Sequence, residues 1–295
     1  MSDLKEIKSI RVVPFTLMSS SISAVLGFLY AIVLVVIMGI IGTSLSQGNL
    51  GAGTLATLAL AMILALPTAS FLITTLQSFL ETVLYNIFVP RLGGIKLELE
   101  DLNEVKSIPV VPFSLMISSI TTVLMFLVML ILGPLFMSLM QGAALSGRIP
   151  GVDSFGALGI LGILIMIIGV PIATFVVVFI VSALTAIFYN LLAPKIGGIQ
   201  FEFALLSEKL HEIRSIPVVK FAVILTVVGA ILTFIFGILG MALSIAAGTS
   251  ASSAALDLLI NVAINFVIGF VVYAITAALY NFLAPKIGTV KLELE

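Results

Sequence analysis

The chain has 295 residues, of which 61% are hydrophobic and only 9% are charged, and its mean hydropathy is +1.34. Soluble domains carry about 25% charged residues, so this composition indicates an integral membrane protein. A formal net charge of −1 argues against nucleic acid as a partner, and a chain without Cys has neither disulfides nor Cys metal sites. The opening MSDLKEIKSIRVVPF lacks a short apolar run with a cleavage site, so we expect no removable signal peptide.

The same phrases recur three times, which marks an internal repeat. Each unit opens with SIRVVPF, SIPVVPF or SIPVVKF and closes with YNIFVPRLGGIKLELE, YNLLAPKIGGIQFEFA or YNFLAPKIGTVKLELE. Between them lie two apolar runs and a short polar, Gly-rich break, which is typical of a membrane hairpin with a tight turn. We therefore divide the chain into hairpin repeats at 1–104, 105–206 and 207–295.

In chain order, the apolar runs predict six transmembrane helices at roughly 15–43, 55–89, 113–141, 155–193, 221–247 and 255–284. Of the thirteen Lys and Arg residues, only Arg148 falls on the side of the hairpin turns. The positive-inside rule then predicts a multi-pass protein of the cell (plasma) membrane with both termini and both linkers in the cytoplasm. Three hairpins inserted in one orientation should be related by rotation about the membrane normal, as a pseudo-threefold bundle.

The closing phrase predicts how each even-numbered helix ends. An amphipathic Tyr is suited to the cytoplasmic interface, the following Asn is polar, a Pro stops the helix, and Gly supplies a turn. The repeated Tyr-Asn pairs are Tyr85 and Asn86, Tyr189 and Asn190, and Tyr280 and Asn281; the prolines are Pro90, Pro194 and Pro285.

After the turn, apolar and polar residues alternate, which predicts a half-buried strand. The opening phrases contain Ile10, Val12, Val13 and their counterparts, which are β-branched and favour partner strands. The predicted fold class is thus an all-α polytopic membrane protein with six transmembrane helices and short cytoplasmic β-strands before and after each hairpin. Six such strands can form a small sheet or ring, which would cover their edges.

A two-helix unit that ends in Tyr-Asn, a Gly-Gly turn and an alternating strand resembles, in three tandem copies, a transmembrane domain family of unknown function best known from small actinobacterial membrane proteins. The third copy departs from it at Thr289, where the second Gly is missing, and at Lys220, where the Pro of VVPF is lost. The resemblance implies the two-helix fold and no activity.

Catalytic chemistry has little support in the sequence. The only His is His211, in the charged linker LSEKLHEIRS, where we expect a solvated residue. One His without Cys cannot form a usual zinc site, and we find no phosphate-binding loop, nucleophile elbow or paired intramembrane carboxylates. We expect no enzyme activity, no catalytic or metal-ligating residues and no cofactor.

Polar residues recur at matched depths inside the spans. Two interpretations apply: they are small contacts between packed helices, or they form rings along a pathway on the pseudo-threefold axis. Fewer polar residues in the second and third copies favour packing. The matched positions are Ser20, Ser118 and Thr226 on the odd-numbered helices, and Ser70, Thr174 and Asn265, then Glu81, Thr185 and Thr276, on the even-numbered helices.

Two acidic residues stand apart from these sets. Glu81 lies one turn from the predicted interface, where it can reach water or pair with Arg91, or else belong to a pathway. Asp257 is expected at the amino end of the sixth helix, stabilised by the helix dipole. We expect a structural or accessory subunit that packs in the lipid bilayer with itself or other membrane proteins; the alternative is a pore for ions or small solutes.

Overall fold

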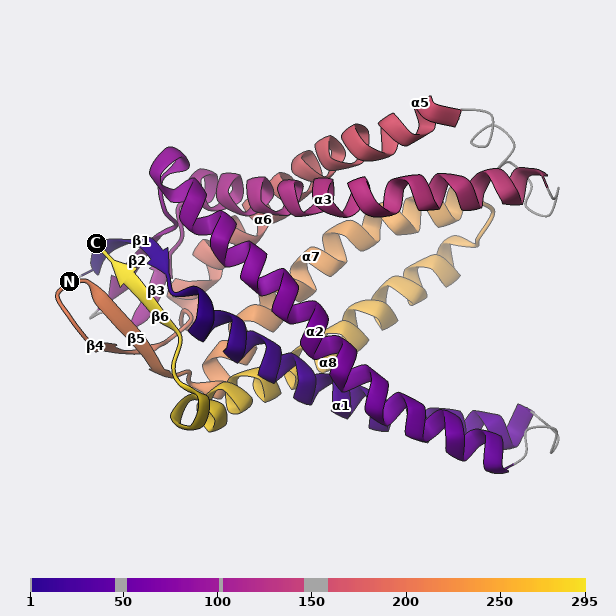
Figure 1. The fold of residues 1–295 in the computed structure, drawn as a ribbon, viewed down its shortest axis with the longest axis horizontal. Helices are drawn as coiled ribbons and strands as arrows, with labels where there is room; N and C mark the ends of the chain where they lie inside the picture. Colours follow the sequence, from indigo (N-terminus) through magenta and orange to yellow (C-terminus); the bar gives the residue numbers. More distant parts are fainter. Residues whose placement is uncertain (1, 46–51, 101–102, 146–158) are drawn as a thin grey trace.

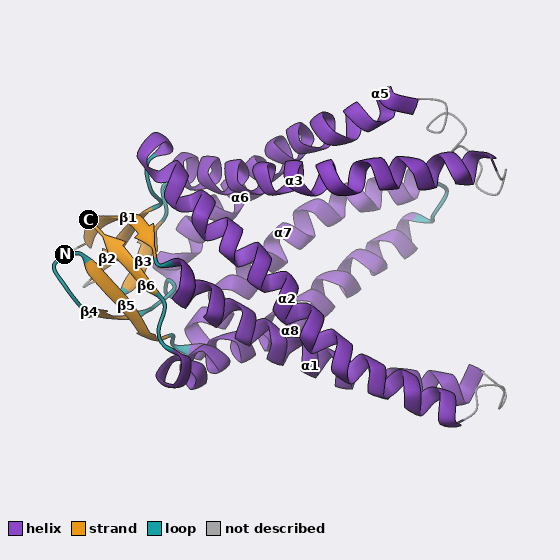
Figure 2. Ribbon diagram, in the orientation of Figure 1, coloured by secondary structure: helices purple, strands orange, loops and turns teal. Residues whose placement is uncertain are grey.

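The computed structural model describes residues 2–45, 52–100, 103–145 and 159–295, and it consists of long helices with a small sheet at one end (Figures 1 and 2). The helices are α1 (Val12–Leu45), α2 (Ala52–Leu92), α3 (Val110–Leu145), α5 (Gly159–Leu164), the π-helical turn η1 (Ile165–Gly169), α6 (Val170–Ile196), α7 (Val218–Ala246) and α8 (Ala251–Ile287). Because α5, η1 and α6 follow one another directly, they form a single span.

Six helices in the described part of the chain are long and apolar enough to cross a membrane, which confirms the prediction of a multi-pass membrane protein. The all-α class is wrong, because the strands form a six-stranded sheet and make the fold mixed. The longest helix, α2, has 41 residues. At 1.5 Å per residue it is about 60 Å long, roughly twice the hydrocarbon thickness of a bilayer.

The helices pack as three hairpins, in which α1 contacts α2, α3 contacts α6, and α7 contacts α8. Neighbouring hairpins contact each other through α2 and α3, α6 and α7, and α8 and α1. Each such contact joins the second helix of one hairpin to the first helix of another. The hairpins converge at the sheet and spread apart toward their turns, and both termini lie at the sheet (Figure 1).

The sheet is antiparallel, with the order β3-β2-β1-β6-β5-β4. Its two ends meet, since the N–H of Val105 in β3 donates to the carbonyl of Ile199, just before β4, at 2.9 Å. The strands therefore form a ring in which the expected opening and closing strands alternate. Their bounds are β1 (Ser2–Ile10), β2 (Lys96–Glu100), β3 (Glu104–Ser107), β4 (Glu202–Leu205), β5 (Leu210–Ser215) and β6 (Lys291–Leu294).

The predicted opening strands are too long. β1 ends at Ile10, and Val12 and Val13 begin α1. Pro14 then lies at the third helical position, where its missing N–H has no intrahelical partner to lose. The local preference of two valines for extended structure is overridden by the helix that follows them.

The predicted role of proline as the helix stop is also wrong. Pro90, Pro194 and Pro285 lie inside the last turns of α2, α6 and α8. Each helix ends at the glycine three residues later, which has a φ of +81° at Gly93 and +90° at Gly197. A left-handed residue of this kind stops a helix, and glycine adopts it without a Cβ clash.

Of the three predicted hairpin turns, only the third lies wholly among the described residues. There α8 begins after Ser250, whose side chain accepts the N–H of Ser253 at 3.2 Å and caps the helix. Arg148 and most of the two other predicted breaks, at 44–53 and 141–154, lie outside the described residues.

Candidate functional site

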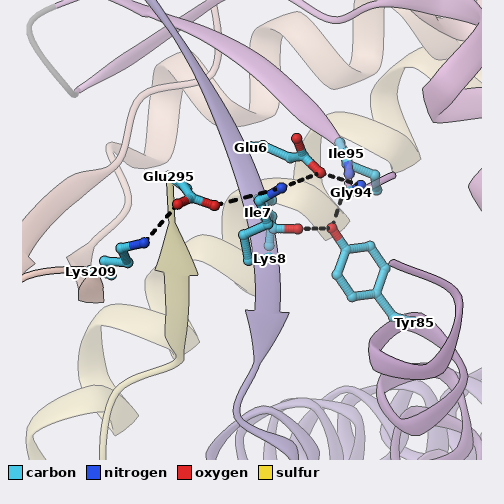
Figure 3. Close-up of polar contacts among 8 residues, drawn as sticks. All are labelled: Glu6, Ile7, Lys8, Tyr85, Gly94, Ile95, Lys209 and Glu295. Atoms are coloured by element: carbon cyan, nitrogen blue, oxygen red, sulfur yellow. Dashed lines mark hydrogen bonds and ion pairs between the residues drawn. The ribbon is translucent and has the colours of Figure 1, made fainter. Parts of the chain in front are cut away.

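The repeated Tyr-Asn pairs fasten the helices to the strand ring. In the first unit, the Tyr85 hydroxyl donates to the carbonyl of Ile7 at 2.6 Å and accepts the N–H of Ile95 at 3.0 Å (Figure 3). The N–H of Ile7 donates directly to the carbonyl of Ile95 at 2.9 Å. Two residues paired in an antiparallel ladder can exchange two such bonds. Here the second bond is replaced by the tyrosine hydroxyl, which stands between its donor and acceptor.

The same arrangement occurs in the other two units. Tyr189 donates to Val105 at 2.5 Å and accepts from Ile199 at 2.8 Å. Tyr280 donates to Ile213 at 2.6 Å and accepts from the N–H of Val290 at 3.2 Å. The direct bonds from Val105 to Ile199 and from Ile213 to Val290 are also present, each at 2.9 Å. One hydroxyl therefore completes the ladder at the same point of every repeat.

The asparagine that follows each tyrosine pairs with the end of the opening strand. Asn86 accepts the N–H of Ile10 through Oδ1 and donates to its carbonyl through Nδ2, both at 2.9 Å. Asn190 and Asn281 make the same two bonds to Ile108 and Ile216, at 2.8–2.9 Å. A carboxamide has the donor and acceptor of a peptide group, so it can satisfy both backbone groups where the strand changes into a helix.

A glutamate from each opening strand holds the turn after the helix. Glu6 accepts the N–H of Gly94 at 2.6 Å, and Glu104 accepts the N–H of Gly198 at 2.9 Å. A Cβ at Gly198 would lie 2.0 Å from the Val105 carbonyl oxygen, so a side chain there would displace the strand. In the third unit Thr289 occupies this position, and its hydroxyl donates to Glu212 at 2.7 Å instead.

We call each set of Tyr, Asn and Glu a clasp. The three clasps are Tyr85, Asn86 and Glu6; Tyr189, Asn190 and Glu104; and Tyr280, Asn281 and Glu212. The glutamates were not among the predicted site residues, although the repeat marks them. Each stands three residues before the Ser of the opening phrase, in EIKSI, EVKSI and EIRSI. The explanation of the tyrosines as amphipathic side chains that face the membrane interface is wrong, because the protein itself buries them to exposures of 3%, 2% and 4%.

Each clasp glutamate pairs with the cation two residues later. Glu6 lies 3.0 Å from Lys8, Glu104 lies 3.1 Å from Lys106, and Glu212 lies 3.2 Å from Arg214. Lys8 also reaches Glu295, which binds Lys209 at 2.6 Å (Figure 3). Lys8 thus links Glu6 of its own strand to Glu295 at the end of β6, and Lys106 links Glu104 of its own strand to Glu100 of β2.

The pKa values of the clasp carboxyls reflect these contacts. Burial raises the pKa of Glu6, but the N–H of Gly94 and the ammonium of Lys8 lower it by more, and the net pKa lies below the ordinary 4.5. The pKa of Glu104 is lowered against burial in the same way, by Gly198, Gln200 and Lys106. For Glu212 the hydroxyl of Thr289 is the largest cause of a lowered pKa, followed by burial, which opposes it.

The matched polar residues of the spans make their hydrogen bonds within single hairpins. Ser20 is buried and accepts from Thr75 at 2.9 Å, and Thr74 donates to Ser23 at 2.8 Å, so these bonds join α1 to α2. Ser70 also faces α1, since a Cβ at Gly27 would lie 2.6 Å from its Oγ.

In the other two hairpins the matched positions do not repeat these bonds. Phe179 and Phe270 stand where Thr75 stands in the first unit. Among the described residues, the Ser118 hydroxyl donates to the Leu115 carbonyl of its own helix, and the buried Thr226 hydroxyl has no partner. The remaining positions lie along the even-numbered helices: Thr174 is half-buried, while Thr185, Asn265 and Thr276 donate to carbonyls one turn earlier.

Two single residues differ from expectation. Glu81 accepts from Gln77 at 2.8 Å, while Arg91 donates to the Ile87 carbonyl at 3.3 Å, so the suggested pairing of Glu81 with Arg91 is not made. His211 was expected in solvent and is instead buried in β5, with its ring edge-on to Phe203. The side chains of β5 alternate in burial: His211 and Ile213 are buried, Glu212 is half-buried and Arg214 is exposed.

The clasp predicts a specific cost for removing one hydroxyl. Tyr189→Phe keeps the ring but leaves the Val105 carbonyl and the Ile199 N–H without their partner in a buried site. We expect the free energy of unfolding to fall by about 1–3 kcal/mol, measured by unfolding in mixed micelles. Tyr30→Phe is the control, because Tyr30 is 49% exposed. Equal, small effects of both substitutions would contradict the role of the hydroxyl.

The lowered pKa values predict loss of stability in acid. A carboxyl whose pKa is lower in the folded state stabilises the fold above its unfolded pKa, near 4.5, and loses this contribution as the pH falls through its folded pKa. We expect the melting temperature in detergent to decrease as the pH falls below about 4.5. The triple variant Glu6→Gln, Glu104→Gln and Glu212→Gln should have a lower melting temperature at neutral pH and a smaller decrease in acid. If the melting temperatures of the two proteins decreased in parallel with pH, the clasp glutamates would not be the cause of the acid sensitivity.

Comparison of the chain with protein-family models, with curated proteins and with solved structures found no match. The resemblance to the two-helix domain family therefore depends on the repeated motif alone.

Proposed function

We propose that the protein is a non-enzymatic structural or accessory subunit of a membrane, which packs laterally with copies of itself or with other membrane proteins. The observation that carries this proposal is the use of its polar groups. The clasp side chains are engaged with backbone groups of the ring, and the hydroxyls of the first hairpin bond within that hairpin. These polar groups thus act in holding the fold.

The outer surface of the helices supports lateral packing. Large apolar side chains such as Leu72, Ile131 and Ile172 are 60–75% exposed on α2, α3 and α6. In a bilayer these faces meet lipid or another apolar helix. The spread of the hairpins away from the sheet increases the length of helix that each can offer to a neighbour (Figure 1).

We further propose that the hairpins are related by a pseudo-threefold axis along the membrane normal, with both termini cytoplasmic in the plasma membrane. Equivalent pairs across the ring support this arrangement: Ser9 with Glu293, Ser107 with Glu98, and Ser215 with Glu202. The cyclic order of helix contacts supports it too. The resemblance to a two-helix domain in three copies agrees with this arrangement.

A pore remains the second candidate because of one observation. Glu81 lines a cavity of about 250 Å³ between α2, α3 and β1, together with Thr82, Thr121 and the ring of Tyr85. A carboxylate at the mouth of a narrow path attracts cations. In the other two units the position of Glu81 is occupied by Thr185 and Thr276, so this feature is not repeated.

The topology can be tested by labelling, since the chain has no Cys to interfere. Single Cys residues at Ser252, in the first turn of α8, and at Ser207, between β4 and β5, report the two ends of the molecule. With an impermeant maleimide applied to whole cells, we expect Ser252→Cys to react and Ser207→Cys to react only after lysis. The reverse pattern would invert the proposed orientation, and reaction of both in intact cells would exclude a membrane-spanning hairpin.

Flux measurements separate the structural subunit from the pore. If the hydroxyls are packing contacts, Thr174→Val and Ser118→Ala should each change stability by at most about 1–2 kcal/mol. Proteoliposomes should then show background permeability to ions and small solutes, and crosslinking in native membranes should capture copies or partners. A reproducible current that changes its cation preference in Glu81→Gln would overturn the structural proposal in favour of the pore.

A further inference from the structure

The third hairpin contains a polar groove. It has a volume of about 360 Å³, lies between α7 and α8, and is lined by the polar residues Thr233, Ser244, Asp257, Asn261 and Asn265. Asp257, Asn261 and Asn265 are spaced by four residues, or about one helical turn, so they form a stripe along one face of α8. The stripe extends from about 9 Å to about 21 Å beyond the first residue of α8, at 1.5 Å per residue.

The predicted explanation of Asp257 by the helix dipole is wrong. α8 begins at Ala251 and has no acidic residue in its first turn. The effect of the dipole fades beyond that turn. Asp257 lies nearly two turns into α8 with its side chain exposed, and the described residues offer it no ion pair. Charged side chains on apolar helices are rare and usually have a function or a partner.

The repeats show that the fold does not need this polarity. The residues of α2 that correspond to Asp257 and Asn261 are Met62 and Leu66. Gly27 and Ala31 of α1 correspond to Thr233 and Gly237 of α7. In the first unit the same interface is close and has Ser70 as its polar residue: Ala31 is fully buried, and Gly27 lies against Ser70.

The groove presents acceptors. The Asn261 amide donates through Nδ2 to the Asp257 carbonyl at 2.8 Å, and the Asn265 amide donates through Nδ2 to the Asn261 carbonyl at 2.8 Å. Each of these bonds uses one of the two N–H donors of an amide and leaves its Oδ1 as an acceptor, beside the carboxylate of Asp257. The lining contains neither Lys nor Arg. Its chemistry therefore fits a ligand that is positively charged and carries hydrogen-bond donors.

The volume of the groove and its apolar residues indicate which kind of cation it fits. A water molecule occupies about 30 Å³ of liquid, so the groove holds far more than a bare metal ion. Met241, Ala254 and Leu258 give it apolar walls next to the acceptors. Gly237 allows Leu258 to pack closely against α7, since a Cβ there would lie 2.3 Å from Leu258 Cδ1. We propose that this groove binds a small organic ammonium, with the charged group at Asp257 and the amide oxygens and the hydrocarbon against the apolar wall.

The test uses the whole protein in nanodiscs of neutral lipid, with butylammonium as the probe and saturation-transfer NMR as the readout. Empty nanodiscs correct for partition into lipid, and butyrate is the charge-reversed control ligand. We expect saturable binding of butylammonium and none of butyrate. Asp257→Asn should weaken binding at least about tenfold, the loss of one charge-assisted contact. Glu208→Gln removes an exposed carboxyl at the other end of the molecule and should have no effect.

A second variant distinguishes a specific loss of binding from a loss of the folded state. Asn261→Leu introduces the residue of the first unit, is compatible with a helix, and should also weaken binding while the melting temperature is kept. Unchanged binding in Asp257→Asn and Asn261→Leu would overturn the proposal, as would equal binding of butyrate. The proposal would also fail if butylammonium did not bind and the same variants instead changed the oligomeric state, because the groove would then be an interface between copies.

Discussion

The structure depends on a tyrosine hydroxyl that completes a β-ladder. At the junction of helix and strand, the carbonyl of Ile7 and the N–H of Ile95 do not bond to each other, and Tyr85 bonds to both. A buried backbone group without a partner is costly, so the tyrosine must reach this point for the ring to be stable there. Because Tyr85 belongs to α2, the same contact fixes where the helix meets the ring.

Other constraints of the fold follow from this contact. For the hydroxyl to enter the ladder, the chain must turn sharply after the helix, which requires the positive φ of Gly93 and the close approach of Gly94 to β1. The turn exposes an N–H that Glu6 accepts. The third unit shows how far this can vary: Thr289 replaces the second glycine, and its hydroxyl keeps Glu212 engaged.

The repeated phrases were enough to predict the number of spans, the hairpins and the strands, because apolar length and period-two alternation are local properties. They could not predict the role of Tyr85, since amphipathic residues near a helix end serve equally at a lipid interface or in a buried contact. The groove at Asp257 was missed for a similar reason. The position of Asp257 in α8 depends on where the helix begins, and the packing of Leu258 beside it depends on Gly237 of the opposite helix.

Three copies in one chain allow the needs of the fold to be separated from other features. The clasp is retained in every unit, so it belongs to the architecture. The bond between Thr75 and Ser20 occurs in one unit and is replaced by Phe179 and Phe270 in the others, so hairpin packing has several solutions. Asp257 and Asn261 are neither part of the clasp nor part of the hydrogen bonds that pack a hairpin. They are polar at positions where the first unit has the apolar residues Met62 and Leu66. Since an unpaired carboxylate on an apolar helix usually has a function, the third hairpin is where a function beyond structure should be sought.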